Sequence, residues 1–198
     1  MVTSAYMAGR NKYGRPQAML FANNSGTIVD GAYVPTGDEF TDFIILSDHN
    51  RESLDFSLNR IEQRERMING RMRSYHIADK LNVNVSWTML PSRSFANGPD
   101  FDEDGNPSET IVTNREQYTV DGGAGGVELL DWYESNPGSF WVYLAYDKNT
   151  NFSTDQYGRL AQYNEIVEVF FADFQYTVTK RGKTNHDFWD VSFSLEEV

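Results

Sequence analysis

The sequence contains no cysteine, which excludes a disulfide framework and any metal site built on thiolates. It has only three histidines, His49, His76 and His186, and none of them has the spacing of metal ligands. No apolar run approaches the length of a membrane span, and the first fifteen residues lack the apolar stretch of a signal peptide. We therefore expect no bound metal or cofactor and no membrane partner.

Basic residues are also few, because 17 lysines and arginines stand against 29 aspartates and glutamates, a net charge of −12. Phosphate neutralisation supplies most of the non-specific affinity for nucleic acids, so this acidity argues against a general nucleic-acid binder. It suits a surface that must not adhere to DNA. At 198 residues the chain is long enough for one domain with its own core, or for one domain with an elaborate arm.

Apolar and polar residues alternate most clearly in two segments, 53–68 and 81–90. Such alternation is typical of strands that bury one face. Between the two segments lies Asn69-Gly70, the strongest short-range signal for a hairpin turn, because both residue types tolerate positive φ. Five arginines lie close to this turn: Arg60, Arg64, Arg66, Arg71 and Arg73. The sequence therefore predicts a long β-hairpin that carries a ribbon of arginines.

Shorter alternating segments predict further strands at about 41–46, 71–78, 110–120, 139–146, 164–172, 174–180 and 188–196. Segment 139–146 is apolar on both faces, which indicates a strand buried on both sides. The only good helix is predicted at about 127–135, ended by an Asn-Pro-Gly sequence. The polar segments 91–109 and 147–160 have the composition of loops. This pattern predicts a mainly β fold, a sandwich or barrel with one helix and a long hairpin.

Residues 1–40 are polar, glycine-rich and weakly periodic, with a short strand expected only near Met19 to Ala22. Such a segment gains little by packing on its own chain. We therefore expect two parts: an extended N-terminal arm over residues 1–40 that becomes ordered on assembly, and a β domain over residues 41–198.

The segment 100–105 holds three alternating aspartates followed by Gly105, as at the start of a calcium loop. The match then fails, because Ile111 stands where such a loop needs a bidentate glutamate, and no helices are predicted to flank it. We favour an acidic turn in contact with solvent, with calcium binding as the weaker alternative.

A glycine-rich segment, 121–126, lies between a predicted strand and the helix. Its backbone N–H groups could cradle an anion. However, Glu128 stands where a dinucleotide fingerprint needs a further glycine, and the lysine of a phosphate-binding P-loop is absent. We favour a structural role for these glycines, either tight passage from strand to helix or the close approach of a neighbouring subunit.

Catalysis has no positive support in the sequence. There is no Gly-x-Ser-x-Gly elbow, and a cysteine nucleophile is impossible. Carboxylates are plentiful, but nothing in the sequence singles out a catalytic pair. We therefore do not expect an enzyme; a cell-wall hydrolase is the least favoured alternative.

The arginine ribbon has three interpretations. Contact with nucleic acid is disfavoured by the interleaved Glu62, Glu65 and Asp79 and by the acidity of the whole chain. A strand face in contact with solvent would need no function. We favour a surface between subunits, because arginine is enriched at interfaces and its fork pairs with carboxylates, which the chain has in excess. The predicted oligomer interface consists of Arg64, Arg66, Asn69, Gly70, Arg71 and Arg73.

A family resemblance is carried by the stretches Ser47-Asp-His-Asn-Arg-Glu-Ser-Leu54, Arg66-Met-Ile-Asn-Gly-Arg-Met-Arg73, Ala78-Asp-Lys80, Trp87-Thr-Met-Leu-Pro91, Thr119-Val-Asp-Gly-Gly123, Lys180-Arg-Gly182 and Val191-Ser-Phe-Ser-Leu-Glu-Glu-Val198. Over about residues 43–198 the chain resembles small structural proteins of long-tailed bacteriophages with non-contractile tails.

The resemblance implies a tail-tube-like fold, a β-sandwich or barrel with one helix that assembles into a ring, often six-fold. It implies a virion protein, assembled in the host cytoplasm, whose partners are copies of itself and neighbouring tail proteins. DNA would be only cargo in transit. Tube, tube-completion and distal tail proteins share this pattern.

A distal tail or decoration module is the alternative from another class of function. Such a module would attach receptor-binding proteins or bind a host glycan. Aromatic side chains could stack on sugars, although aromatic residues on strands more often belong to the core. The candidates for such stacking are Trp132, Trp141, Tyr143 and Tyr146.

Overall fold

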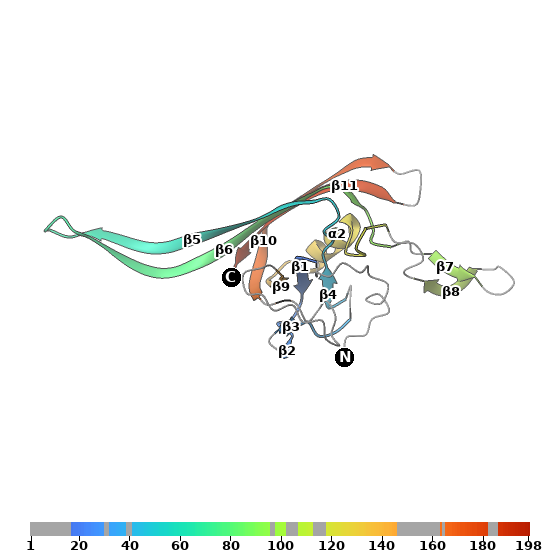
Figure 1. Cartoon of the computed structure of the whole chain (residues 1–198), viewed down its shortest axis with the longest axis horizontal. Coiled ribbons are helices and arrows are strands. Elements are labelled where there is room, and N and C mark those ends of the chain that lie inside the picture. The colour runs from blue at the N-terminus through green and yellow to red at the C-terminus, as the bar shows by residue number, and fades with distance from the viewer. Residues whose placement is uncertain are drawn as a thin grey trace.

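A computed structural model of the chain describes residues 17–29, 32–38, 41–95, 98–101, 107–112, 118–145, 163, 165–181 and 186–198. Over these residues the protein is mainly β, with one helix and a seven-stranded antiparallel sheet of order β4-β1-β9-β10-β11-β6-β5 (Figure 1). The sheet strands are β1 (Met19–Ala22), β4 (Phe43–Ile45), β5 (Arg51–Arg66), β6 (Met72–Pro91), β9 (Phe140–Leu144), β10 (Glu165–Arg181) and β11 (Asp187–Glu197).

Two small ladders and a helix complete the described elements. They are the pair β2 (Thr27–Val29) and β3 (Ala32–Val34), the pair β7 (Gly98–Phe101) and β8 (Pro107–Val112), and helix α2 (Gly126–Ser135). The predicted mainly β fold, the helix and the long hairpin are thereby confirmed. No helix in the described ranges is long and apolar enough to cross a membrane.

The larger core lies on the face of the sheet that α2 covers. Alternation along β11 places Trp189, Val191, Phe193 and Leu195 in this core, while Ser192 and Ser194 point to the other face. The helix adds Leu129 and Trp132, and its first residue lies so close to the Trp189 ring that a Cβ at Gly126 would come within 2.9 Å of it. Only a glycine lets the helix pack this closely.

Strands β1 and β9 are buried on both faces. Phe21 and Val142 belong to the larger core, whereas Leu20 and Tyr143 belong to a second apolar cluster on the opposite face. The prediction for segment 139–146 is confirmed over the five residues of β9. At this end of the sheet two apolar layers cover the strands, while β10, β11, β6 and β5 leave a polar face open.

The sheet is not closed into a barrel. Its two edge strands, β4 and β5, follow each other in the chain, and the linking residues 46–50 span at most about 20 Å. The sheet must therefore curl so that its edges approach each other. The glycine-rich loop fills the gap, because Ala124 donates its N–H to the Ile45 carbonyl at 2.7 Å and Leu46 forms a parallel bridge with Ala124. This loop takes the place that a closing ladder would need.

The expected boundary between an arm over residues 1–40 and a domain from residue 41 needs a correction. The short strand predicted near Met19 to Ala22 forms, but it is a fully buried strand between β4 and β9. Its backbone pairs with a neighbouring strand on each side, and its side chains are buried on both faces of the sheet. Residues 19–22 are therefore integral to the sheet, and residues 1–16 lie outside the described part of the chain.

Four other sequence-based boundaries also differ. The expected breaks within residues 71–90 and 164–180 do not occur, because β6 and β10 each run through them as one long strand. Neither break contains a glycine or proline that would interrupt the ladder. The segment 91–109 was expected to be irregular, but it contains β7 and the start of β8. The strand expected at 110–120 is confirmed only up to Val112, and residues 118–121 form a turn.

Candidate assembly interface

The hairpin of β5 and β6 extends beyond the rest of the sheet. The ladder between β6 and β11 ends at Asn82, so the outer residues of β6 pair only with β5. Figure 1 shows this outer part projecting away from the body, with its turn at the far end of the molecule. We call residues 59–80 the far half of the hairpin, and residues 51–58 with 81–91 its near half.

The turn forms where the sequence places it. Gly70 has a φ of +79° and donates its N–H to the Met67 carbonyl at 2.8 Å. The Asn69 side chain accepts the Arg71 N–H at 3.0 Å, and Met67 donates to the Arg71 carbonyl at 2.8 Å. Asn69 and Gly70 therefore shape the turn that carries the predicted interface. A side chain at residue 70 would meet no other atom within 4 Å.

On one face of the far half, the charged side chains pair with one another. Arg60 donates to Asp79 at 3.0 Å, and His76 lies 3.1 Å from the same carboxylate. Nearer the turn, Arg64 donates to Glu62 at 2.6 Å and Ser74 also donates to Glu62. Hydrogen bonds from Ser74 and Arg64 lower the pKa of Glu62, and the hydrogen bond from Arg60 lowers the pKa of Asp79. These charges are paired within the hairpin.

The other face and the turn carry apolar side chains that are in large part exposed. Ile61 lies opposite Ala78, and Tyr75 lies opposite Gln63 on the same face. Ile77 is the extra residue of a β-bulge between these two pairs. More than half of the large apolar side chains exposed among the described residues belong to the hairpin: Phe56, Leu58, Ile61, Met67, Ile68, Met72, Tyr75 and Ile77.

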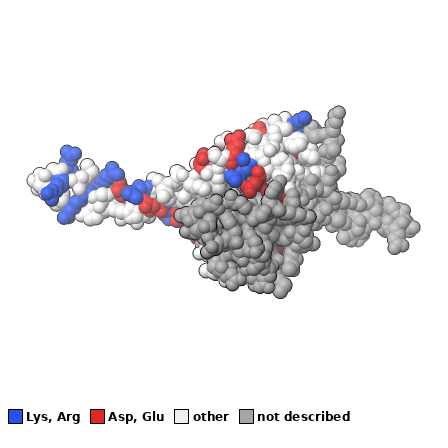
Figure 2. Space-filling view, in the orientation of Figure 1, with Lys and Arg blue, Asp and Glu red and all other residues white. Residues whose placement is uncertain are grey.

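The predicted interface arginines are all exposed near the turn, but they are not equivalent. Arg64 is bound to Glu62 within the hairpin, while Arg66, Arg71 and Arg73 make no ion pair with any other described residue. Residues 64–73 contain four arginines and one glutamate, a net charge of +3 on a chain of −12. Figure 2 shows the basic side chains gathered toward the end of the hairpin, with acidic side chains closer to the body.

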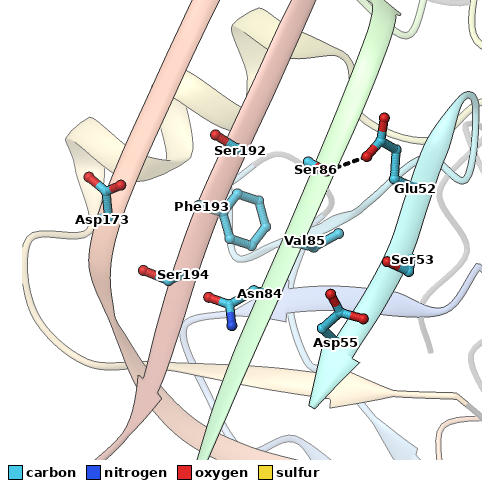
Figure 3. Close-up of a pocket in the computed structure, with 10 residues that line it drawn as sticks. All are labelled: Glu52, Ser53, Asp55, Asn84, Val85, Ser86, Asp173, Ser192, Phe193 and Ser194. Atoms are coloured by element: carbon cyan, nitrogen blue, oxygen red, sulfur yellow. Dashed lines mark hydrogen bonds between the residues drawn. The ribbon is translucent and has the colours of Figure 1, made fainter. Parts of the chain in front are cut away.

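The open face of the sheet contains a shallow polar hollow of about 330 Å³ across β5, β6, β11 and β10. Its lining, drawn in Figure 3, includes three carboxylates, Glu52 and Asp55 from β5 and Asp173 from β10, and the Ser86 hydroxyl donates to Glu52 at 3.2 Å. None of its ten lining residues is a histidine, lysine or arginine. The hollow therefore offers an acidic surface that no basic side chain neutralises.

The glycine-rich segment is a structural passage, as favoured from the sequence. Its N–H groups bond within the chain: Gly122 donates to Thr119, Gly123 to the Asp121 carboxylate and Gly125 to the Glu128 carboxylate. A Cβ at Gly123 would come within 2.5 Å of the Ser47 backbone. The close approach is thus made to the chain itself rather than to a neighbour, and these N–H groups are not available to cradle an anion.

A buried polar network anchors the same segment. Asp121 accepts the Ser47 hydroxyl at 2.6 Å and the Asp48 N–H at 2.8 Å. His49 accepts the Val120 N–H on Nδ1 at 3.2 Å, and burial lowers the pKa of this imidazole. Burial raises the pKa of Asp48, against the lowering effect of its hydrogen bond from Arg51. Ser47 is buried and its hydroxyl is committed to Asp121, so this Ser-His-Asp grouping holds the loop and is not arranged as a nucleophile and base.

Two of the aromatic residues considered for sugar stacking are buried. Trp132 lies in the larger core, and Tyr143 lies in the second cluster with its hydroxyl donating to the Asn24 carbonyl at 2.8 Å. Burial raises the pKa of Tyr143. Trp141 is half-buried against the second cluster, and Tyr146 falls outside the described residues. Sugar stacking by Trp132 or Tyr143 would require opening the fold.

The acidic segment 100–105 can be assessed only in part. Residues 102–105, which hold two of its three aspartates and the glycine, lie outside the described residues. Within the ranges that are described, no group of three or more histidine, aspartate or glutamate side chains could hold a metal ion.

Sequence reasoning identified the arginines of the hairpin but missed its apolar face. The signal was present in the alternation of β5. Residues 55, 57 and 59 point to one face of the strand and are polar, whereas Ile61, the next residue on that face, is apolar. Such a reversal moves apolar side chains to the face that was polar nearer the body.

The chain matches no protein-family model and no curated protein sequence.

Proposed function

We propose that the chain is a structural subunit of a long, non-contractile bacteriophage tail, in which copies associate into a ring on or at the end of the tail tube. The far half of the hairpin contacts a neighbouring copy. The observation that carries this proposal is the exposure of the large apolar side chains of the far half, beyond the point where β11 stops pairing with β6. The resemblance of the chain to tail structural proteins supplies the biological context.

A two-stranded hairpin is only marginally stable in water unless it packs against something else. The far half nevertheless exposes apolar side chains on one face and around its turn. Exposed apolar surface of this kind marks a contact with another molecule more often than a surface in contact with water. A copy of the same chain suits it, because the excess of carboxylates elsewhere in the chain complements the arginines near the turn.

A projecting hairpin that docks on a different surface of the next copy makes a head-to-tail contact. Such contacts generate a ring when the rotation closes, and an open filament when it does not. The open face of the sheet supports the ring, because its three carboxylates would repel DNA phosphates and no basic side chain lines the hollow to bind them. That property is required of the wall of a DNA passage.

The test compares the wild-type chain with the double variant Arg71→Glu, Arg73→Glu by native mass spectrometry at low salt. We expect wild-type rings, whose mass gives the number of subunits, and a largely monomeric variant. The matched control Arg71→Lys, Arg73→Lys keeps the charge but loses the planar fork, and should assemble with intermediate affinity. Circular dichroism would verify that all three fold. A wild-type chain that stays monomeric would refute self-assembly, and unaffected rings in the glutamate variant would refute the hairpin contact.

A further inference from the structure

A second exposed apolar surface lies on the body, far from the hairpin turn. It consists of Tyr133 on α2 with Phe174, Tyr176 and Val178 on β10, and we call it the aromatic patch. The Tyr133 and Phe174 rings are stacked 4.6 Å apart, and Phe174 lies 6.4 Å from Tyr176. The exposed fractions are 39% for Tyr133, 49% for Tyr176 and 47% for Val178, so a large part of each of these side chains is open at the surface.

The strand that carries this patch also has an open edge. Strand β9 pairs with β10 only from Glu165 to Val169, so the part of β10 under the patch pairs on one side alone, with β11. An uncovered apolar patch beside an unpaired strand edge is a surface that proteins usually protect or use for association.

The charge next to the patch is negative. Glu134 follows Tyr133 in helix α2 and is exposed. Asp131 lies on the other side of the helix, where it lines a pocket with Asn23 and Thr41. Tyr133 lies in the last turn of the helix, where the unpaired carbonyl groups add partial negative charge. No basic side chain in that turn offsets this charge. The patch therefore combines stacked aromatic rings with the Glu134 carboxylate and a negative helix end.

The hairpin turn has the complementary chemistry. It presents Arg66, Arg71 and Arg73 without an ion-pair partner in the described chain, beside the exposed side chains of Ile68 and Met72. A guanidinium group both pairs with carboxylates through its fork and stacks on aromatic rings, whereas an ammonium group does only the first well. All the basic residues in 60–79 are arginines apart from His76.

We propose that the hairpin turn of one copy docks on the aromatic patch and the last turn of α2 of a second copy. This inference rests on the proposed self-assembly and names its acceptor surface. The contact must form between copies, because Figure 1 shows the turn projecting away from α2 and from the body. The two surfaces differ, so each copy donates a hairpin on one side and accepts one on the other.

The polar hollow on the open face is the competing acidic acceptor, and it fits less well. Its surface is formed mainly by serine, asparagine and carboxylate side chains, which offer little apolar area to Ile68 and Met72. Asp173 also accepts a hydrogen bond from the Gln175 amide at 2.7 Å. The aromatic patch satisfies both the apolar and the cationic side chains of the turn.

The first experiment is disulfide crosslinking with introduced cysteines, because the chain has no cysteine of its own. The variant Ile68→Cys, Ser135→Cys places one thiol at the hairpin turn and one at the end of α2, and it leaves every charge in place. Under mild oxidation we expect a ladder of disulfide-linked dimers, trimers and larger species. The matched control Ile68→Cys, Ser192→Cys moves the second thiol to the hollow and should give at most weak dimers. Equal or stronger ladders from the control would overturn the proposed acceptor.

The second experiment exchanges the charges. Chains with Arg71→Glu, Arg73→Glu and chains with Glu134→Arg should each assemble at least tenfold more weakly than wild type. Mixed together, they should assemble in alternation, because each hairpin then meets an acceptor of opposite charge. Wild-type chains that remain monomeric would refute the proposed function itself. Wild-type assembly together with normal assembly of the Glu134→Arg chains would refute only this docking surface.

Discussion

The near and far halves of the hairpin are built from the same two strands but lie in different environments. The backbone ladder continues from one half to the other, with a single register shift within the far half at Ile61. In the near half, β6 lies between β5 and β11 and its apolar side chains enter the core. In the far half, both strands have an open outer edge and their apolar side chains are exposed.

This difference shows that alternation alone does not decide burial. Val83 and Val85 are buried because α2 and β11 complete a core around them, whereas Ile61 and Ile77 have no such layer in the described chain. Strand formation and burial are therefore separate consequences of the sequence. The far half has the backbone of a sheet, and we propose that it gains the missing layer from another copy.

The largest contrast should come from one large aliphatic residue in each half. Leu90 in the near half is fully buried, while Ile77 in the far half is 68% exposed. Leu90→Ala should lower the free energy of unfolding by about 2–5 kcal/mol, because it leaves a cavity in the core. Ile77→Ala should lower it by no more than about 0.5 kcal/mol. Urea unfolding of the monomer measures both, and equal losses would mean that the halves are packed alike.

Alanine substitutions at two glycines, one in the body and one at the hairpin turn, compare how tightly the two regions are packed. A Cβ at Gly123 would meet the Ser47 Cα at 2.5 Å, so Gly123→Ala should cost about 3 kcal/mol by pushing backbone against backbone. Gly70 has open space around it, so Gly70→Ala should cost only about 1 kcal/mol, from its positive φ. Thermal unfolding compares the two variants directly. A larger loss at Gly70 would indicate that the turn is enclosed in the monomer.

The pKa of a carboxyl group in the body and the pKa of one in the hairpin should be shifted in opposite directions. Burial raises the pKa of Glu128, despite its hydrogen bonds from Ser94 and Gly125. As pH rises from the ordinary value of 4.5 through this raised pKa, the unfolded chain loses its proton first, so the contribution of Glu128 to stability falls. The pKa of Glu62 is lowered, so its contribution is present above its ordinary pKa and is lost as pH falls through the lowered value.

Carbon-13 NMR titration of the side-chain carboxyl groups measures these shifts. Glu128→Gln should remove the titration found above the ordinary range and leave the signal of Glu62 unchanged. A Glu128 that titrates in the ordinary range would mean that its carboxylate is open to water.

Local patterns were sufficient to predict most strands, the helix and the turn. The alternation in 188–196 gives the buried face of β11 directly, and Asn69-Gly70 gives the hairpin turn, because both depend on near neighbours in the chain. The strand at Met19 to Ala22 was also anticipated, but its insertion between β4 and β9 depends on contacts with residues more than twenty positions away. The open sheet has the same origin, since the loop at Ala124 fills the gap between its edges.

The candidate interface was only half predictable for a related reason. Charge is visible in composition, so the arginines were identified from the sequence. The exposure of Ile61, Tyr75 and Ile77 depends on where the other strands end, and β11 stops pairing at Asn82. Without that endpoint, apolar residues on a predicted strand are naturally assigned to the core.

The most direct test of the central claim removes the far half and keeps the near half. Ile61 and Ala78 face each other in the ladder, so replacing residues 62–77 with Asn-Gly should close a shorter hairpin with the core intact. Sedimentation velocity should then find a folded monomer at concentrations where the wild-type chain forms rings, with nearly unchanged stability against urea. A shortened chain that still forms rings would contradict the account.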